Sequence, residues 1–128
     1  MKDTVVIVED DELIRDSLLE VLEEHGYNTI GAGDGREALD KLAKLDKLPC
    51  LIVLDLMMPV MDGREFRRVQ LEDPVLKAIP VVVISAFRDL DEIAKELAPA
   101  AHFKKPLKLR DFLNIVQTHC PHFQADSP

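Results

Sequence analysis

Short runs of consecutive apolar residues recur along the chain, and more polar segments separate them. The three clearest runs are rich in β-branched residues and cover Val5–Val8, Leu51–Leu54 and Val81–Ile84. Because these runs lack polar alternation, they are typical of strands that are buried on both faces of a parallel sheet. Two weaker runs, Asn28–Ala32 and Ala101–Lys104, predict two further strands.

Apolar residues recur at helical spacing in the segments between these runs. The stripes are Ile14, Leu18, Val21 and Leu22; Ala38, Leu39, Leu42 and Leu45; Phe66 and Val69; a short stripe within Asp89–Leu97; and Leu109, Phe112, Leu113 and Val116. Gly26 follows the first stripe and Asp34-Gly35 precedes the second, which are common signals for a helix end and a helix start. Strand and helix thus alternate five times. This order predicts an α/β fold with a doubly wound parallel sheet and helices on both faces.

Composition narrows the class of protein further. The chain has 128 residues, 47% of them hydrophobic and 31% charged, which suits a single globular domain. We expect this domain over residues 1–122 and a frayed polar tail over residues 123–128. Asp and Glu (24) outnumber Lys and Arg (16), so the formal net charge is −8. The acidic excess argues against binding to nucleic acid or to an anionic membrane.

Two features of the sequence bear on the cellular compartment. No apolar stretch approaches the roughly 18 residues of a transmembrane helix, and the N-terminus has no signal peptide. The two cysteines, Cys50 and Cys120, are too few for a disulfide scaffold in a chain of this length, so we expect reduced thiols. These features predict a cytoplasmic protein without a membrane partner.

Polar side chains follow the predicted strands. Glu9 and Asp10 follow the first strand, Asp55 the third and Ser85 the fourth, while Lys105 follows the fifth. In a doubly wound sheet, ligands bind beyond the carboxyl ends of the strands. Carboxylates gathered there repel one another by about 3 kcal/mol for each pair about 6 Å apart, and a divalent cation cancels this repulsion. Oxygen ligands without His or Cys favour Mg²⁺ or Mn²⁺.

Asp55 is the candidate nucleophile among the residues at the carboxyl ends of the strands. An ionised carboxylate that leaves a buried strand for a crevice can attack phosphorus and form an aspartyl phosphate. Ser85 and Lys105 supply a hydroxyl and an ammonium group that would hold the phosphoryl oxygens. Taken singly, Asp11 is a helix N-cap, Ser85 a turn residue and Lys105 a solvated charge. Their placement at the ends of successive strands favours the functional interpretation.

Four segments carry these residues and resemble the motif set of the response regulator receiver domain of two-component signalling. They are Val-Ile-Val-Glu9-Asp10-Asp11, Leu-Asp55-Leu-Met-Met-Pro59-Val-Met-Asp-Gly63, Val-Ile-Ser85-Ala86 and Phe-Lys-Lys105-Pro106. The resemblance covers residues 4 to about 119. It implies a flavodoxin-like (βα)5 fold with strand order 2-1-3-4-5, in a stand-alone receiver or in one cut from a longer protein.

The resemblance also implies how a cation is held. Asp55 is the phosphoacceptor, and it binds Mg²⁺, or Mn²⁺, together with Asp10 and the backbone carbonyl of Met57. Glu9 acts on the cation largely through water. Each of these assignments is an expectation that rests on the family resemblance.

Further roles are implied around the phosphoryl group. Ser85 is the switch hydroxyl that hydrogen-bonds to it, and Lys105 pairs with it. The Lys105-Pro106 bond is a candidate cis peptide. Gly63 is expected to have a positive φ in the loop after the third strand.

The chain departs from the family pattern at several positions. His102 stands where the family has Tyr or Phe, and it is either a polar rotamer switch or an exposed edge residue. Pro99–Ala101 replaces a Gly-Ala pair, which predicts a short fourth helix. Met57 and Phe87 flank the expected phosphate, where they either obstruct the attacking water and slow hydrolysis or merely pack.

The resemblance implies a phosphoaccepting switch that is not an enzyme. A sensor histidine kinase or a histidine phosphotransfer protein donates the phosphoryl group, and the face formed by residues 89–97, 101–104 and 109–116 contacts a downstream protein. A Mg²⁺-dependent aspartyl-phosphate phosphohydrolase is disfavoured, because Met57 stands where such enzymes carry a second Asp. A degenerate receiver acting only as a binding module is disfavoured, because every phosphorylation residue is present. A flavin or nucleotide domain needs a Gly-rich turn where Glu9–Asp11 stands.

Overall fold

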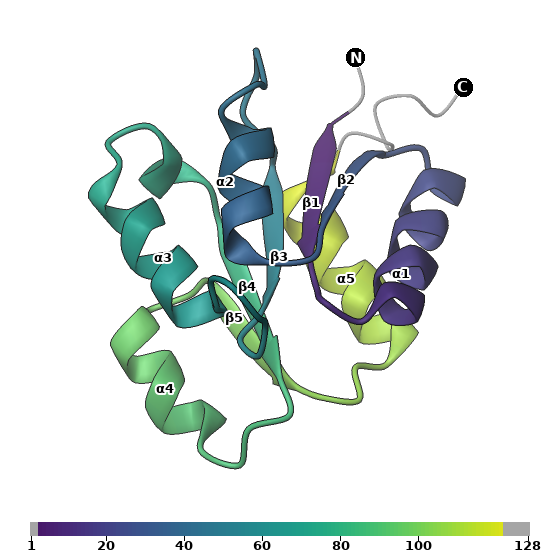
Figure 1. The fold of residues 1–128 in the computed structure, drawn as a ribbon. Helices are drawn as coiled ribbons and strands as arrows, with labels where there is room; N and C mark the ends of the chain where they lie inside the picture. Colours follow the sequence, from purple (N-terminus) through teal and green to yellow (C-terminus); the bar gives the residue numbers. More distant parts are fainter. Residues whose placement is uncertain (1–2, 122–128) are drawn as a thin grey trace.

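The computed structural model describes residues 3–121, in which strands and helices alternate along the chain (Figure 1). The elements are β1 (Thr4–Val8), α1 (Glu12–Glu24), β2 (Asn28–Ala32), α2 (Gly35–Leu42), β3 (Leu51–Asp55), α3 (Gly63–Glu72), the 3₁₀ helix η1 (Leu76–Ala78), β4 (Val81–Ser85), α4 (Leu90–Leu97), β5 (Ala101–Lys104) and α5 (Leu109–His119). All neighbouring strands pair in parallel, in the order β2-β1-β3-β4-β5. The predicted doubly wound fold and its strand order are confirmed.

The sheet separates two layers of helices, and each layer has its own core. Alternate residues of a strand point to opposite faces. In β1, Val6 and Val8 therefore pack with Phe66 in the core under α2, α3 and α4, whereas Val5 and Ile7 pack in the core under α1 and α5. Figure 1 shows α1 and α5 on one side of the sheet and the other three helices on the opposite side. Burial on both faces explains why the central strands lack polar alternation.

Local differences from the predicted elements have simple causes. Leu45 lies beyond the end of α2, directly after a turn, yet it still packs against the core. Its side chain therefore contacts the core, as the apolar stripe predicts, although its backbone is not helical. The short helix η1 lies in a segment for which no element is predicted.

Gly63 is required for a different reason from the one predicted. In the loop between β3 and α3, the residue with positive φ is Val60, at 65°, and Gly63 is not in the left-handed region. A Cβ at Gly63 would lie 2.4 Å from the carbonyl oxygen of Asp55 and 2.8 Å from the Cα of Leu56. The predicted positive φ is therefore wrong, and close approach of the backbone excludes a side chain there.

The two cysteines form a disulfide bond, which corrects the expectation of reduced thiols. Cys50 directly precedes β3 and Cys120 directly follows α5, and their Cα atoms lie 5.7 Å apart although 70 residues separate them in sequence. The sequence gives no sign of this pairing because only the packing of α5 across the sheet brings the two residues together.

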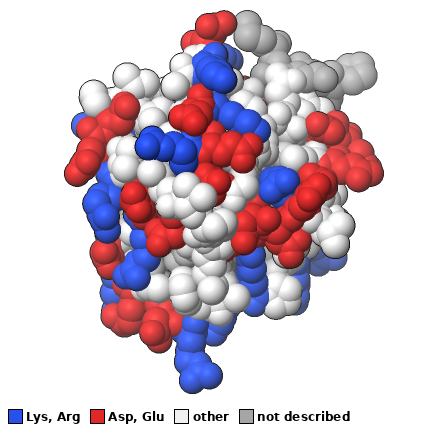
Figure 2. Space-filling model, viewed as in Figure 1, with Lys and Arg blue, Asp and Glu red and all other residues white. Residues whose placement is uncertain are grey.

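The surface contains acidic and basic residues in mixture. Figure 2 shows Lys and Arg interspersed among Asp and Glu on one face, without a broad basic area. Within residues 3–121, no helix combines the length and the apolarity needed to cross a bilayer. The tail predicted over residues 123–128 lies outside the described residues.

Candidate functional site

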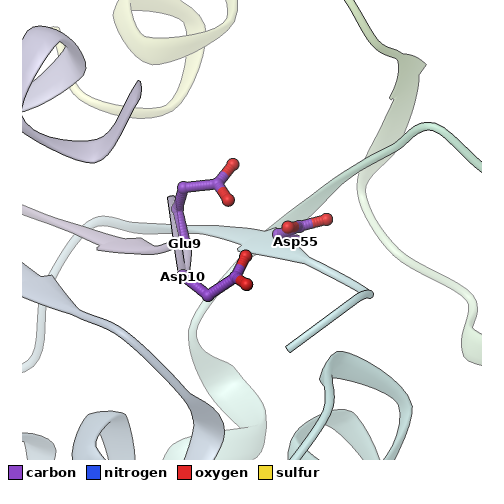
Figure 3. A group of neighbouring side chains, drawn as sticks. All are labelled: Glu9, Asp10 and Asp55. Atoms are coloured by element: carbon purple, nitrogen blue, oxygen red, sulfur yellow. The ribbon is translucent and has the colours of Figure 1, made fainter. Parts of the chain in front are cut away.

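Three carboxylates meet at the carboxyl ends of neighbouring strands. Glu9 and Asp10 directly follow β1, and Asp55 is the last residue of β3, which pairs with β1 through Val8 and Leu54. Figure 3 shows the side chains of Glu9 and Asp10 reaching from the end of β1 toward Asp55. One carboxylate oxygen from each residue lies within 4.8 Å of the other two. The parallel register thus brings together the predicted acidic residues.

Lys105 provides a positive charge next to the cluster. Its ammonium donates hydrogen bonds to Oε1 of Glu9 at 2.7 Å and to Oδ2 of Asp55 at 3.3 Å. Glu9 and Asp55 are each only 4% exposed. Burial by itself lowers the pKa of Lys105, but the hydrogen bond to Glu9 and the negative charge of Asp55 outweigh it and raise this pKa above its usual value. Lys105 is therefore held as an ammonium by both buried carboxylates.

Asp10 is the exposed member of the cluster. Its pKa is raised above the usual value, first by desolvation and then by a hydrogen bond with Glu9 and by the charge of Glu9. Lys105 acts in the opposite direction. The raised pKa of Asp10 therefore reflects desolvation first, and the neighbouring carboxylate of Glu9 adds to it.

The donor set fits a hard divalent cation. The three residues that could hold a metal together offer carboxylate oxygens, with no imidazole or thiolate among them. Mg²⁺ typically takes one or two carboxylates and completes its shell with water and substrate oxygens. The peptide N–H of Met57 donates to Oδ1 of Asp55 at 3.4 Å, which places the Met57 backbone directly beside the cluster.

Ser85 lies under the site, at the end of the next strand. It is completely buried, and its hydroxyl oxygen accepts the N–H of Phe87 at 3.0 Å. Its carbonyl accepts the N–H of Lys105 at 2.9 Å, which ties the end of β5 to the end of β4. The Lys105-Pro106 peptide bond is cis, as predicted. The structure therefore places Ser85 and Lys105 side by side at the same rim as Asp55.

Met57 and Phe87 line one hollow beside Asp10. Met57 is 52% exposed, whereas Phe87 packs partly against the core under α4. Both side chains therefore flank the site on the solvent side. Their effect on water attack stays a prediction.

His102 lies apart from the acidic cluster, on the surface between β5 and α4. Its side chain is 38% exposed, and its Nε2 lies 3.0 Å from Oδ1 of Asp91 in α4. Phe103, the next residue, instead packs into the core under α5. His102 is thus an outward-facing residue in this conformation, and its role as a switch stays a prediction.

Two residues near the site have structural contacts of their own. Asp11 is the N-cap of α1 and accepts the N–H of Ile14 at 3.1 Å, as its simpler interpretation predicts. The prediction from sequence missed Arg15, whose Nη1 donates to the carbonyl oxygen of Glu9 at 2.9 Å. The available signal was its position one helical turn after Asp11, close to the start of α1.

Curated relatives of the chain include several signalling regulators. Transcriptional regulatory protein PdtaR of Mycobacterium tuberculosis is 38% identical over 94% of this chain, which spans 58% of that protein's length. Sporulation initiation phosphotransferase F of Bacillus subtilis is 36% identical over 94% of this chain and 96% of its own. Polar-differentiation response regulator DivK of Brucella anthropi is 32% identical over 93% of this chain and 97% of its own.

Solved structures give the same result. The receiver domain of a histidine kinase from Syntrophus aciditrophicus superposes with a TM-score of 0.84 at 30% identity, covering 94% of this chain and 91% of its own. Chemotaxis protein CheY4 of Vibrio cholerae superposes with a TM-score of 0.82 at 27% identity, covering 93% and 99%. Residues 5–117 match the profile of the response regulator receiver domain. This match covers most of the chain and includes Glu9, Asp10 and Asp55, so the chain belongs to the response regulator receiver domain family.

Proposed function

We propose that the chain is a phosphoaccepting switch of a two-component phosphorelay, with Asp55 as the acceptor. The observation that carries the proposal is the environment of Asp55. This carboxylate is buried at the end of a central strand, beside two further carboxylates and within 3.3 Å of the Lys105 ammonium. Such a group can act as a nucleophile toward phosphorus while the neighbouring charges hold the transferred oxygens.

The donor in this proposal is a phosphohistidine on a sensor histidine kinase or on a histidine phosphotransfer protein. A carboxylate oxygen of Asp55 forms the new P–O bond as the P–N bond to the imidazole breaks. The other ring nitrogen of the phosphohistidine is protonated, so the imidazole leaves as the neutral ring and keeps that proton. The reaction moves one phosphoryl group and leaves Asp55 modified, so the chain is a phosphoacceptor rather than an enzyme with turnover.

Asp10, Asp55 and the backbone carbonyl of Met57 would hold Mg²⁺, or Mn²⁺, and Glu9 would act through water. The cation supplies positive charge that offsets the repulsion between the carboxylates and the incoming phosphoryl oxygens. Lys105 would pair with one of those oxygens, since its ammonium already bridges Glu9 and Asp55.

Ser85 would link the site to a surface that contacts a target. Its hydroxyl hydrogen-bonds within the loop that leads to α4, through Phe87. If the Ser85 hydroxyl turned to hydrogen-bond a phosphoryl oxygen, its contact with the N–H of Phe87 would change and the loop would move. The face of α4, β5 and α5 would then change conformation. A downstream protein in the cytoplasm would bind to that face and respond to its conformation.

Intact mass measurement after incubation with acetyl phosphate and Mg²⁺ tests the proposal. Wild type should gain the mass of one phosphoryl group, and it should not do so when EDTA replaces Mg²⁺. Asp55→Asn should gain none, whereas Asp46→Asn, at an exposed position in the loop before β3, serves as the matched control and should react like wild type. An unmodified wild type, or an equal adduct on Asp55→Asn, would contradict the proposal.

A further inference from the structure

Arg15, in helix α1, contacts the backbone of the acidic cluster formed by Glu9, Asp10 and Asp55. Its side chain is half-buried, and its Nη1 donates a hydrogen bond to the carbonyl oxygen of Glu9 at 2.9 Å. This carbonyl belongs to the peptide unit that joins Glu9 to Asp10. The phosphoryl chemistry proposed above does not use Arg15, so the contact needs its own explanation.

The other side of Glu9 is held as well. The N–H of Glu9 donates to the carbonyl oxygen of Ala32, at the end of β2, at 2.9 Å. Because the peptide unit is planar, fixing its oxygen restricts the rotation that sets the direction of the next residue. Arg15 and Ala32 therefore hold the peptide units on both sides of Glu9, directly before Asp10.

Two glycines provide the space that the Arg15 side chain occupies. A Cβ built at Gly31 would lie 3.3 Å from Cδ of Arg15, and one built at Gly33 would lie 3.4 Å from its Nη1. The aliphatic part of Arg15 thus crosses β2 at one glycine, and the guanidinium rests against the other. A Cβ at position 33 would already touch the guanidinium, so the two further methyl groups of a valine would crowd it, together with Oε1 of Glu37.

A simple ion pair does not explain the contact. Glu37 is a nearby acid, and its ion pair is with Lys41, with Nζ 2.8 Å from Oε2 of Glu37. Lys41 lowers the pKa of Glu37 first, and the charge of Arg15 adds a smaller effect in the same direction. Glu37 also accepts the N–H of Gly33 at 2.9 Å. The guanidinium of Arg15 therefore lies next to a carboxylate that is already paired, and its own hydrogen bond goes to a backbone carbonyl.

We propose that Arg15 is a positioning residue for the cation site: by holding the Glu9 carbonyl it aims the Asp10 carboxylate, and so strengthens Mg²⁺ binding without touching the ion. The inference rests on the proposed function, because it takes the acidic cluster as the Mg²⁺ site. Groups behind metal ligands typically change metal affinity by about 10–100-fold when they are removed.

The sign of the effect separates positioning from simple electrostatics. Arg15 is a positive charge near the acidic cluster, so Coulomb's law alone predicts that its removal tightens Mg²⁺ binding. Loss of positioning predicts the opposite. Arg15→Met, which keeps an unbranched apolar chain in place of the aliphatic part but has no donor, should therefore weaken Mg²⁺ binding about tenfold.

Isothermal titration of Mg²⁺ into the wild type and its variants is the test. Arg15→Lys retains a donor and should recover part of the affinity. Gly33→Val retains the charge but crowds the guanidinium, and it should weaken binding as Arg15→Met does. Arg110→Met, at an exposed position at the start of α5, is the matched control and should bind Mg²⁺ like wild type. Unfolding of each variant in EDTA verifies that it is folded.

The initial rate of phosphorylation by acetyl phosphate gives a second measurement. If Arg15 acts through cation affinity, the rate for Arg15→Met should return to the wild-type value at saturating Mg²⁺. Unchanged or tighter Mg²⁺ binding by folded Arg15→Met and Gly33→Val overturns the inference, while phosphorylation of the wild type leaves the proposed function standing. A wild type that binds no Mg²⁺ and accepts no phosphoryl group overturns both.

Discussion

At the scale of single residues, the acidic rim is arranged for a ligand at the expense of stability. Glu9, Asp10 and Asp55 place negative oxygens within 4.8 Å of one another, and Lys105 contributes a single ammonium. Like charges at about 5 Å repel by about 3 kcal/mol with an effective dielectric near 20, less where solvent screens them. Repulsion of this kind makes the site favourable for a cation and unfavourable for the empty fold.

Neutralising Asp10 should therefore stabilise the protein in the absence of metal. We expect Asp10→Asn to raise the free energy of unfolding in EDTA by about 1 kcal/mol, a modest value because Asp10 is exposed. Mg²⁺ should raise the urea midpoint of wild type and leave that of Asp10→Asn almost unchanged. Asp16→Asn, on the exposed surface of α1, is the control and should follow wild type. A destabilised Asp10→Asn in EDTA would argue against repulsion as the dominant effect.

Met57 offers a prediction about the lifetime of the phosphorylated state. Its half-exposed side chain and Phe87 line the hollow beside Asp10, from which water would approach an acyl phosphate on Asp55. A polar residue that can orient water should speed hydrolysis, so we expect Met57→Asn to lose its phosphoryl group several-fold faster. Loss of the adduct, followed by intact mass after removal of acetyl phosphate, measures this. Met57→Leu should match wild type, and equal rates for all three proteins would show that Met57 merely packs.

At the scale of elements, helix α4 is anchored at its C-terminal end by a buried arginine of α3. Arg67 is 6% exposed, and it donates to the carbonyl oxygens of Leu97 and Ala98 at 2.9 and 2.8 Å and to the side chain of Gln70 at 2.6 Å. Desolvation lowers the pKa of this guanidinium. A cation at the last carbonyls of a helix interacts favourably with the helix dipole. Ala98 ends the helix with φ of 48°, where a Gly would be usual.

Removing the guanidinium should loosen α4 more than the rest of the fold. Arg67→Leu leaves two carbonyls and the Gln70 oxygen without their donor, and we expect it to lower the free energy of unfolding by about 3 kcal/mol. Hydrogen exchange should rise mainly in α4 and in the turn that contains Ala98. Arg68→Leu removes the same charge from an exposed position on α3 and is the control. Equal stability of the two variants would contradict the anchoring role.

At the scale of the whole molecule, the disulfide ties the start of β3 to the end of α5. The same end of α5 is also held by the hydroxyl of Tyr27, which donates to the carbonyl oxygen of Cys120 at 2.6 Å. Both contacts lie at the amino-terminal end of the strands, away from the acidic rim at their carboxyl ends. The disulfide and the proposed phosphoacceptor site thus lie at opposite ends of the strands.

Reduction should weaken the fold and leave phosphorylation in place. A bond that closes a loop with a sequence separation of 70 stabilises by up to about 4 kcal/mol in the chain-entropy description. We expect dithiothreitol to lower the urea midpoint of wild type and to have no effect on Cys50→Ser. Adduct formation with acetyl phosphate should stay similar in both. Alkylation of both cysteines in the native, unreduced protein would show that the bond is absent.

Local sequence pattern was sufficient for the elements and for most of the acidic rim. β-Branched runs and helical stripes report short-range preferences, which the buried strands and amphipathic helices confirm. Glu9, Asp10 and Asp55 could be assigned to one rim because parallel strands end on the same edge of a sheet. Leu45 and η1 show the limit of this reasoning, since apolar spacing identifies contact with the core and not the exact end of a helix.

The sequence by itself determined the succession of strands and helices along the chain, because this depends on neighbouring residues. It also determined that the polar groups at the strand ends lie together, because parallel strands all end on the same side of a sheet. Only the tertiary structure decided the contacts between distant segments. It pairs Cys50 with Cys120, brings Arg67 to the end of α4, and leaves no room for a side chain at Gly63. These contacts depend on how layers pack across the sheet, and no periodicity along the chain encodes such distances.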